Sequence, residues 1–75
     1  MPDRPALAGL VKVTYDRRTD TLSIVLREEV EGATSDENQP GVILDYDADG
    51  NLISLELLDA SRRVTDPRNV DFELT

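Results

Sequence analysis

The sequence predicts a small α+β domain that is mostly β: an antiparallel four- or five-stranded β-meander of two hairpins with a short C-terminal helix. Apolar and polar residues alternate with a period of two in several short segments, and turn-forming residues separate those segments. A chain of 75 residues has the length of one domain. We expect residues 1–9, with two prolines and a glycine, to be a loose leader and residues 10–75 to be the single domain.

The first half of the chain predicts one hairpin and one loop. Residues 11–15 (VKVTY) and 21–27 (TLSIVLR) both alternate apolar and polar side chains. Between them, residues 16–20 (DRRTD) are typical of a turn, because short polar side chains bond their own backbone. Residues 28–39 are polar and predict a connecting loop, which Pro40-Gly41 closes.

The second hairpin has the strongest signal. Residues 42–46 (VILDY) and 52–57 (LISLEL) flank DADGN, and Asp-Gly between two β-rich segments is typical of a hairpin turn. Pairing Asp47 with Asn51 places Ile43 opposite Leu55 and gives the hairpin two apolar faces. We therefore expect cover on both sides, from a helix, another sheet or another copy. The candidate interface residues are Ile43, Ile53, Leu55 and Leu57 on one face, and Leu44, Tyr46 and Leu52 on the other.

The C-terminal part predicts a helical turn and then an edge strand. Residues 58–63 (LDASRR) indicate a short helix with Asp59 as its cap and a basic end that complements the helix dipole. Residues 70–74 (VDFEL) alternate cleanly, which favours a fifth edge strand over a frayed helix.

Charge and composition exclude several classes of function. The net charge is -8, and the stretch from Glu28 to Asp59 is rich in carboxylates and contains no Lys or Arg. Such a surface repels the phosphates of nucleic acid and of anionic membranes. Cysteine and histidine are both absent, so disulfides, thiolate zinc sites and histidine bases are excluded. No apolar run resembles a signal peptide or a membrane span, which predicts a cytoplasmic protein.

Several sequence blocks occur together in a specific order. They are Tyr15-Asp16, residues 40–47 (PGVILDYD), Asp49-Gly50 and residues 56–61 (ELLDAS), and they span roughly positions 11–64. This pattern resembles a family of small, mainly bacterial proteins catalogued only as a domain of unknown function. The resemblance implies a β-meander with a short C-terminal helix and no established activity. It also suggests an antitoxin-sized partner protein, because some members sit beside genes for small toxin-like proteins.

One motif matches a calcium site. Asp45, Asp47 and Asp49, with Gly50 and Glu56, satisfy the spacing of an EF-hand loop. An EF-hand joins two helices, however, whereas Pro40-Gly41 and the β-branched residues after it indicate a strand. The hairpin is therefore the preferred interpretation, and these four acidic residues are only weak metal candidates.

The same carboxylates raise the alternative of an enzyme. Asp45 and Asp47 are two apart on a strand, so they share a face and could act as an acid and base pair. A catalytic pair needs a cleft that raises one pKa, and a domain of this size has little material to build one. A turn stabilised by Asp47 and Asp49, with Asp45 bound to a backbone amide or an arginine, is the simpler interpretation.

The leading prediction is a protein-interaction module without enzymatic activity or cofactor. A domain this small buries only about 60–65% of its chain surface, so a homodimer or higher homo-oligomer is expected. The acidic stretch is the expected docking surface for a basic, toxin-like partner protein. The alternative is a metal- or carboxylate-dependent enzyme using Asp45, Asp47 and Asp49.

Overall fold

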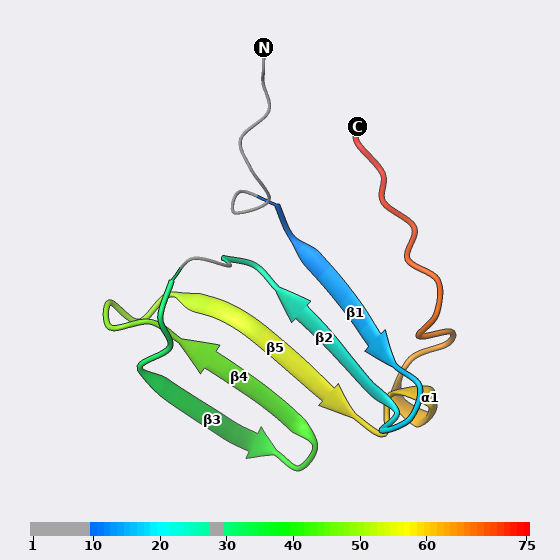
Figure 1. The fold of residues 1–75 in the computed structure, drawn as a ribbon, viewed down its shortest axis with the longest axis horizontal. Helices are drawn as coiled ribbons and strands as arrows, with labels where there is room; N and C mark the ends of the chain where they lie inside the picture. Colours follow the sequence, from blue (N-terminus) through cyan, green and yellow to red (C-terminus); the bar gives the residue numbers. More distant parts are fainter. Residues whose placement is uncertain (1–9, 28–29) are drawn as a thin grey trace.

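Five antiparallel strands form one open sheet, and one short helix follows them (Figure 1). The structure, a computed structural model, describes residues 10–27 and 30–75, so the expected leader lies outside the described residues. The predicted fold class, mostly β with a short C-terminal helix, is confirmed. The elements are β1 (Lys12–Asp16), β2 (Thr21–Val25), β3 (Thr34–Gln39), β4 (Val42–Tyr46), β5 (Leu52–Leu58) and α1 (Ala60–Arg63).

The strand order in the sheet is β1-β2-β5-β4-β3. The two predicted hairpins, β1–β2 and β4–β5, are both present, and β5 pairs with β2 to join them. The chain reaches the far edge from β2 to start β3, and then returns strand by strand to the centre. Read backwards along the chain, β5, β4, β3 and β2 make a Greek key. Among the residues that the structure describes, the sheet therefore has two free edges, β1 and β3.

The predicted register of the β4–β5 hairpin is correct at its turn and wrong beyond it. Tyr46 pairs with Leu52 as expected, but Asp45 then pairs with Ser54, because a bulge on β5 inserts Ile53 as an extra residue. The carbonyl of Ile53 accepts hydrogen bonds from the backbone N–H groups of Leu26 at 2.8 Å and Arg27 at 3.2 Å. The bulge is thus held by the end of β2, which the hairpin sequence alone does not reveal.

This shift by one residue changes which side chains share a face. Leu44 pairs with Leu55 and not with Ser54, and Ile43 pairs with Glu56 and not with Leu55. The expected division of the interface candidates between two faces is therefore wrong, since Leu55 and Leu57 pair on the side of Leu44 and Tyr46, away from Ile43. We call this side the apolar face, made by Val13, Tyr15, Leu22, Ile24, Val42, Leu44, Tyr46, Leu52, Leu55 and Leu57. The bulged Ile53 has no paired residue on β4.

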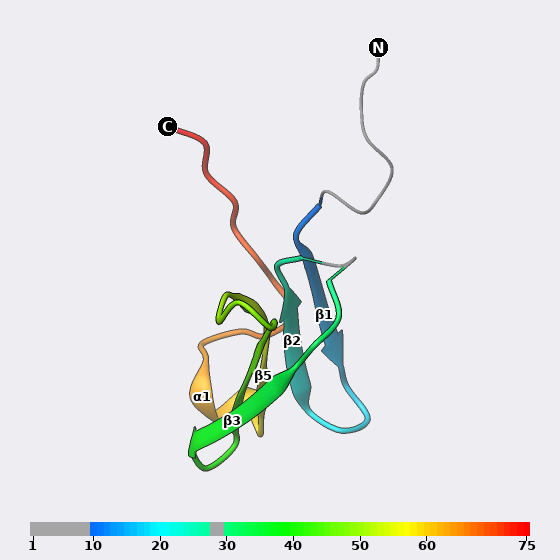
Figure 2. The same ribbon diagram turned by 90° about the vertical axis from the view of Figure 1, so that its left-hand side faces the viewer.

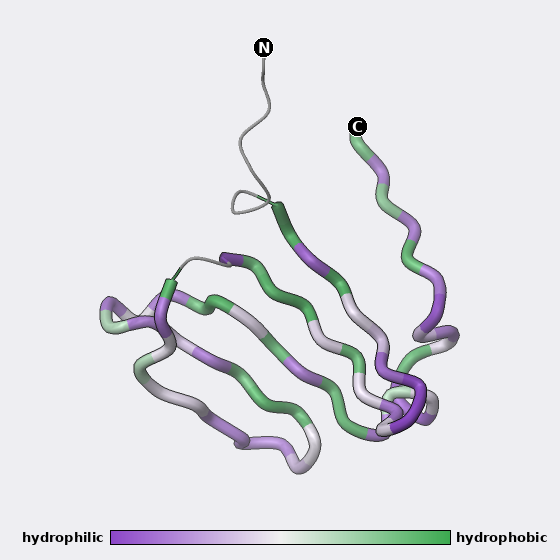
Figure 3. Tube along the Cα trace, viewed as in Figure 1, coloured by the Kyte–Doolittle hydropathy of each residue, from purple (hydrophilic) through white to green (hydrophobic). Residues whose placement is uncertain are grey.

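The opposite side of the sheet, which we call the polar face, is mixed. Hydropathy alternates along β1, whereas β4 begins with three apolar residues in succession, so that one of them, Ile43, lies on the polar face (Figure 3). The polar face carries Lys12, Thr14, Ser23, Val25, Ile43, Asp45, Ser54 and Glu56.

The prediction of a loop over residues 28–39 is wrong for its second half, where residues 34–39 form β3. Five of its six residues are exposed, so neither side of this edge strand needs apolar residues and no alternation marks it. Main-chain pairing with β4 holds it, from Thr34 opposite Tyr46 to Gln39 opposite Val42, with an irregularity between Asp36 and Gln39. Charged residues and irregular pairing are features that protect an exposed sheet edge.

The C-terminal predictions are partly confirmed. The helical turn is present as α1, and Asp59 occupies the N-cap position, but it has a left-handed backbone (φ 55°) and its side chain makes no cap hydrogen bond. Residues 70–74 form no strand; the tail extends away from the sheet (Figure 1). Among the described residues, no helix is long and apolar enough to cross a membrane.

Candidate functional site

The side chains of the apolar face are only partly buried. Only Leu22, Ile53 and Ala60 are buried apolar residues, and no large side chain among the described residues is fully buried. The rest of the central apolar face, including Ile24, Leu44 and Leu55, is half-buried. A sheet with one apolar side normally packs that side on another layer.

Cover on this side comes from one end only. Figure 2 shows α1 on one side of the sheet, near the ends of the strands. Tyr15 identifies that side as the apolar face, because it lines a hollow together with Ser61 and residues 65–68. Within residues 10–27 and 30–75, no helix or strand lies over the middle of the face (Figures 1 and 2).

The β4–β5 turn is built around the carboxylate of Asp47, which is buried. Its Oδ1 accepts hydrogen bonds from the backbone N–H groups of Asp49 and Asn51, each at 2.9 Å. Its Oδ2 accepts from Asn51 Nδ2 at 3.3 Å and lies 3.6 Å from the Arg27 guanidinium. These bonds, above all the one from the Asn51 backbone, hold the pKa of Asp47 below its usual value.

The remaining candidate carboxylates do not converge on Asp47. Asp45 accepts a hydrogen bond from the Ser54 hydroxyl at 2.9 Å, and not from a backbone amide or an arginine as expected. Asp45 also lines a small open hollow with residues 32–35, which neither Asp47 nor Asp49 reaches. Glu56 lies on β5 opposite Ile43. No cluster of three or more acidic residues in the described chain is arranged to hold a metal ion.

A second polar network joins the β1–β2 turn to α1. Asp20 Oδ1 accepts a hydrogen bond from the Tyr15 hydroxyl at 2.6 Å and one from the Ser61 backbone N–H at 3.0 Å. Asp20 Oδ2 accepts from the Ser61 hydroxyl at 2.7 Å, and the Asp20 carbonyl accepts from the Ala60 N–H at 2.9 Å. Asp20, which has a left-handed backbone (φ 54°), therefore caps α1 in place of Asp59.

The hydrogen bonds of this network shift two pKa values in opposite directions. The bonds from Tyr15 and Ser61 stabilise the carboxylate and lower the pKa of Asp20. The same bond to Asp20 stabilises the neutral phenol and raises the pKa of Tyr15. Both pKa shifts favour a charged Asp20 bonded to a neutral Tyr15, as in a contact that stabilises the fold.

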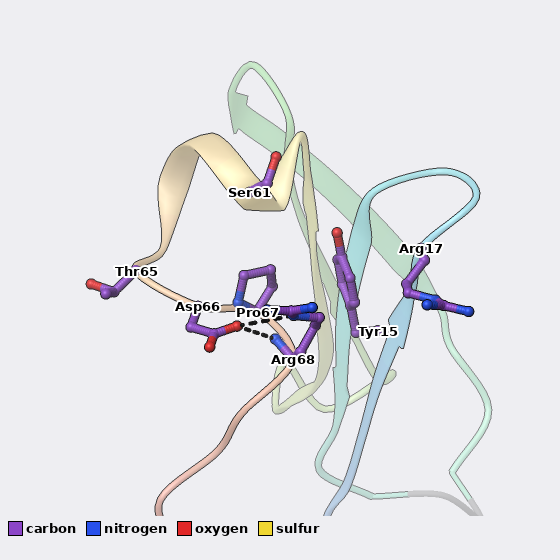
Figure 4. Close-up of a pocket in the computed structure, with 7 residues that line it drawn as sticks. All are labelled: Tyr15, Arg17, Ser61, Thr65, Asp66, Pro67 and Arg68. Atoms are coloured by element: carbon purple, nitrogen blue, oxygen red, sulfur yellow. Dashed lines mark hydrogen bonds and ion pairs between the residues drawn. The ribbon is translucent and has the colours of Figure 1, made fainter.

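The hollow beside this network is open and polar at its rim (Figure 4). Its volume is ≈ 490 Å³, and Figure 4 shows Tyr15 between Arg17 on one side and Arg68 on the other. Arg68 is paired with Asp66 at 3.5 Å and so does not offer its charge freely. The residues around the hollow are Tyr15, Arg17, Ser61, Thr65, Asp66, Pro67 and Arg68.

Hydrogen bonds from Arg63 connect the end of α1 to the β3–β4 turn. Its Nη2 donates to the Pro40 carbonyl at 2.6 Å, and its Nε donates to the Leu58 carbonyl at 2.7 Å. Gly41, with φ 84°, lies directly beneath the guanidinium, so that a Cβ at this position would collide with Arg63 Nη2.

The polar networks described above therefore lie in the turns and at the cap of α1. Comparison with protein families matches residues 12–61, which is 50 of the 75 residues, to the family described as "Protein of unknown function (DUF2283)". The chain belongs to this family. No curated protein and no solved structure matches the chain significantly. The matched DUF2283 region covers all five strands and ends within α1.

Sequence reasoning missed Asp20 and Arg63 as key contacts, because their partners lie 41 and 23 residues away along the chain. Tyr15 and Ser61 belong to the sequence blocks of the family pattern, and both side chains donate to Asp20. The acidic stretch from 28 to 59 does not form one surface: Asp36 and Glu37 lie on β3, Asp47 and Asp49 in the β4–β5 turn, and Asp45, Glu56 and Asp59 on β4, on β5 and at the N-cap of α1. Its members Glu28 and Glu29 lie outside the described residues.

Proposed function

We propose that this DUF2283 chain is a non-catalytic protein-interaction module whose apolar face binds a second copy of itself. The observation that carries the proposal is the apolar face, which spans four strands and which the described part of the chain covers at one end only. Exposed apolar areas of this kind usually mark a binding surface. A second copy brings an identical apolar face, which is what an isologous dimer requires.

Charge placement favours one arrangement of the two copies. Arg17, Arg18 and Arg62 are exposed at the end of the sheet near α1, while the exposed Asp49 lies in the β4–β5 turn at the other end, next to the buried Asp47. A twofold axis between the sheets and perpendicular to the strands reverses the strand direction of one copy. The arginines of each copy then face the acidic turn of the other, and β1 lies over β1.

The test compares adjacent residues of β4 that point to opposite sides. Leu44 is on the apolar face and Ile43 on the polar face, and both are half-buried. We expect the unmodified protein to have at least twice the 8.3 kDa mass of the chain by light scattering. Leu44→Lys should give a monomer with β-rich circular dichroism, whereas Ile43→Lys should keep the oligomer.

Two results would contradict the proposal. One is a folded monomer at millimolar concentration; the other is an oligomer that Ile43→Lys disrupts and Leu44→Lys does not. If Leu44→Lys does not fold, the concentration dependence of the unmodified protein's mass still decides the question, because a monomer shows none.

A second candidate function is a dock for a basic protein at the β3 edge. Asp36 and Glu37 lie on this free edge, which carries no Lys or Arg, and a free edge can pair with an added strand. A peptide alternating Lys and Val should bind more weakly as salt increases, and Asp36→Asn with Glu37→Gln should remove that salt dependence. A peptide alternating Glu and Val is the control, and equal binding of both peptides would rule out the acidic dock.

A further inference from the structure

The tail of the chain is an apolar segment with no partner in the structure. Val70, Phe72 and Leu74 are 65%, 82% and 89% exposed, and they alternate with Asp71 and Glu73. In an extended conformation the three apolar side chains share one side and the two carboxylates the other. We call residues 70–74 the arm.

The departure of the arm from the sheet is set by a hydrogen-bonded turn. The Asp66 side chain accepts from the Arg68 backbone N–H at 3.1 Å and from Asn69 Nδ2 at 2.6 Å. From this turn, near Tyr15, the arm runs away from its own sheet on the side where α1 lies (Figure 2). This is the side of the apolar face, where the proposed second copy would lie.

One of the two free edges has the complementary pattern. Beside β1, Val11 and Val13 are 60% and 38% exposed, and Lys12 lies between them on the polar face. The other edge, β3, carries Asp36 and Glu37, which would repel the carboxylates of the arm. Charge and apolar pattern therefore both favour β1.

We infer that the arm adds to the β1 edge of a second copy as a sixth strand. The arm leaves near its own Tyr15, which in the proposed dimer lies over the Val11 end of the partner's β1, so the arm runs parallel to that strand. With Phe72 beside Val13, Val70 lies beside Val11 and Asp71 beside Lys12. Each apolar residue of the arm then extends the apolar face of the partner, and a carboxylate meets the one lysine of the chain. The inference rests on the proposed dimer, in which β1 lies over β1 and each arm can reach its partner's edge.

Disulfide trapping tests this register, because the chain has no cysteine of its own. Neighbouring strands of a sheet lie about 4.7–4.9 Å apart, so residues side by side on the arm and β1 are within the range of a disulfide. A mixture of the Val13→Cys and Phe72→Cys variants should form a mixed disulfide dimer on oxidation. Thr14→Cys with Phe72→Cys is the control, since Thr14 lies on the polar face and should not link.

Further measurements distinguish the pairing of the arm from the formation of the dimer. Phe72→Lys should raise the dimer dissociation constant roughly tenfold to a hundredfold, because a buried aromatic ring is lost, while Glu73→Gln should change it little. A dimer by light scattering without the mixed disulfide would overturn the arm and leave the proposed function intact. A disulfide formed only within a chain carrying both Val13→Cys and Phe72→Cys would overturn the inference too, since the arm would then pair with its own β1. A monomer under all conditions would overturn both proposals.

Discussion

At the scale of single residues, two glycines share a backbone conformation in different surroundings. Gly41 has φ 84° and Gly50 has φ 86°, and both occupy turns between paired strands. A Cβ at position 50 would meet nothing within 4 Å, whereas a Cβ at position 41 would collide with the Arg63 side chain. The two positions therefore separate the cost of the conformation from the cost of the collision.

Gly50→Ala should lower the free energy of unfolding by about 1–2 kcal/mol, the cost of a left-handed backbone for an L residue. Gly41→Ala should cost more, because Arg63 must also give up its bonds to Pro40 and Leu58. In an Arg63→Ala background the extra cost should disappear. Urea unfolding of the single and double variants measures this, and equal losses for the two glycines would show that the Arg63 contact is unimportant.

The pKa shifts of Asp20 and Tyr15 predict that the folded chain loses stability at both acid and alkaline pH. The folded chain lowers the pKa of Asp20 from 3.8, so the stability from this carboxylate is present above about pH 4 and is lost as the pH falls through the lower, folded value. The folded chain raises the pKa of Tyr15 from 10.0, so stability is lost as the pH rises above 10.0.

The measurement is the melting temperature as a function of pH for the unmodified chain, Tyr15→Phe and Asp16→Asn. Tyr15→Phe removes the hydroxyl and should flatten the alkaline limb, and it should also weaken the acid limb because Asp20 loses a donor. Asp16 accepts only a local bond from Arg18, so Asp16→Asn is the control for a lost carboxylate in the same turn. An unchanged alkaline limb in Tyr15→Phe would mean that the bond to Asp20 does not contribute to stability.

At the scale of elements, the sequence predicts those strands that bury one side. β1 and β2 are predicted from their alternation of apolar and polar residues, and β4 and β5 from the Asp-Gly turn between two apolar segments. β3 could not be found this way, because it is held by main-chain bonds at an exposed edge. The arm shows the reverse case, since it has the alternation of a strand but no neighbouring strand in one copy.

The β5 bulge could not be predicted from the sequence of the β4–β5 hairpin, because hydrogen bonds from the end of β2 hold it. Its extra residue, Ile53, is only 6% exposed, and its side chain lies close to Gly32. Ile53→Ala should lower the free energy of unfolding by about 2–4 kcal/mol through the cavity it leaves. Ile43→Ala, on the polar face of β4, should cost clearly less, and chemical unfolding of the two variants makes the comparison. Similar losses would indicate that both faces of the sheet are buried.

At the scale of the whole molecule, the sequence predicts the apolar surface of the second hairpin but assigns its residues to the wrong faces. The sequence predicts seven apolar residues of the second hairpin as interface candidates, and five of them, all paired in the sheet, share the apolar face. The register error assigned them to two faces, because a one-residue shift exchanges the sides of a strand. The result is one open apolar face in place of two, which one further layer could cover.

A single layer of sheet with a half-buried face predicts that stability depends on protein concentration. If a second copy supplies the missing layer, dissociation accompanies unfolding, and dilution lowers the melting temperature. For a domain of this size, about 1 kcal/mol corresponds to roughly 4–8 °C, so a hundredfold dilution should lower the melting temperature by several degrees. Leu44→Lys should melt at a temperature that does not change with concentration, while Ile43→Lys should behave like the unmodified chain. A melting temperature of the unmodified chain that stays constant over a hundredfold range would mean that the sheet is stable as a single layer, with its apolar face open to water.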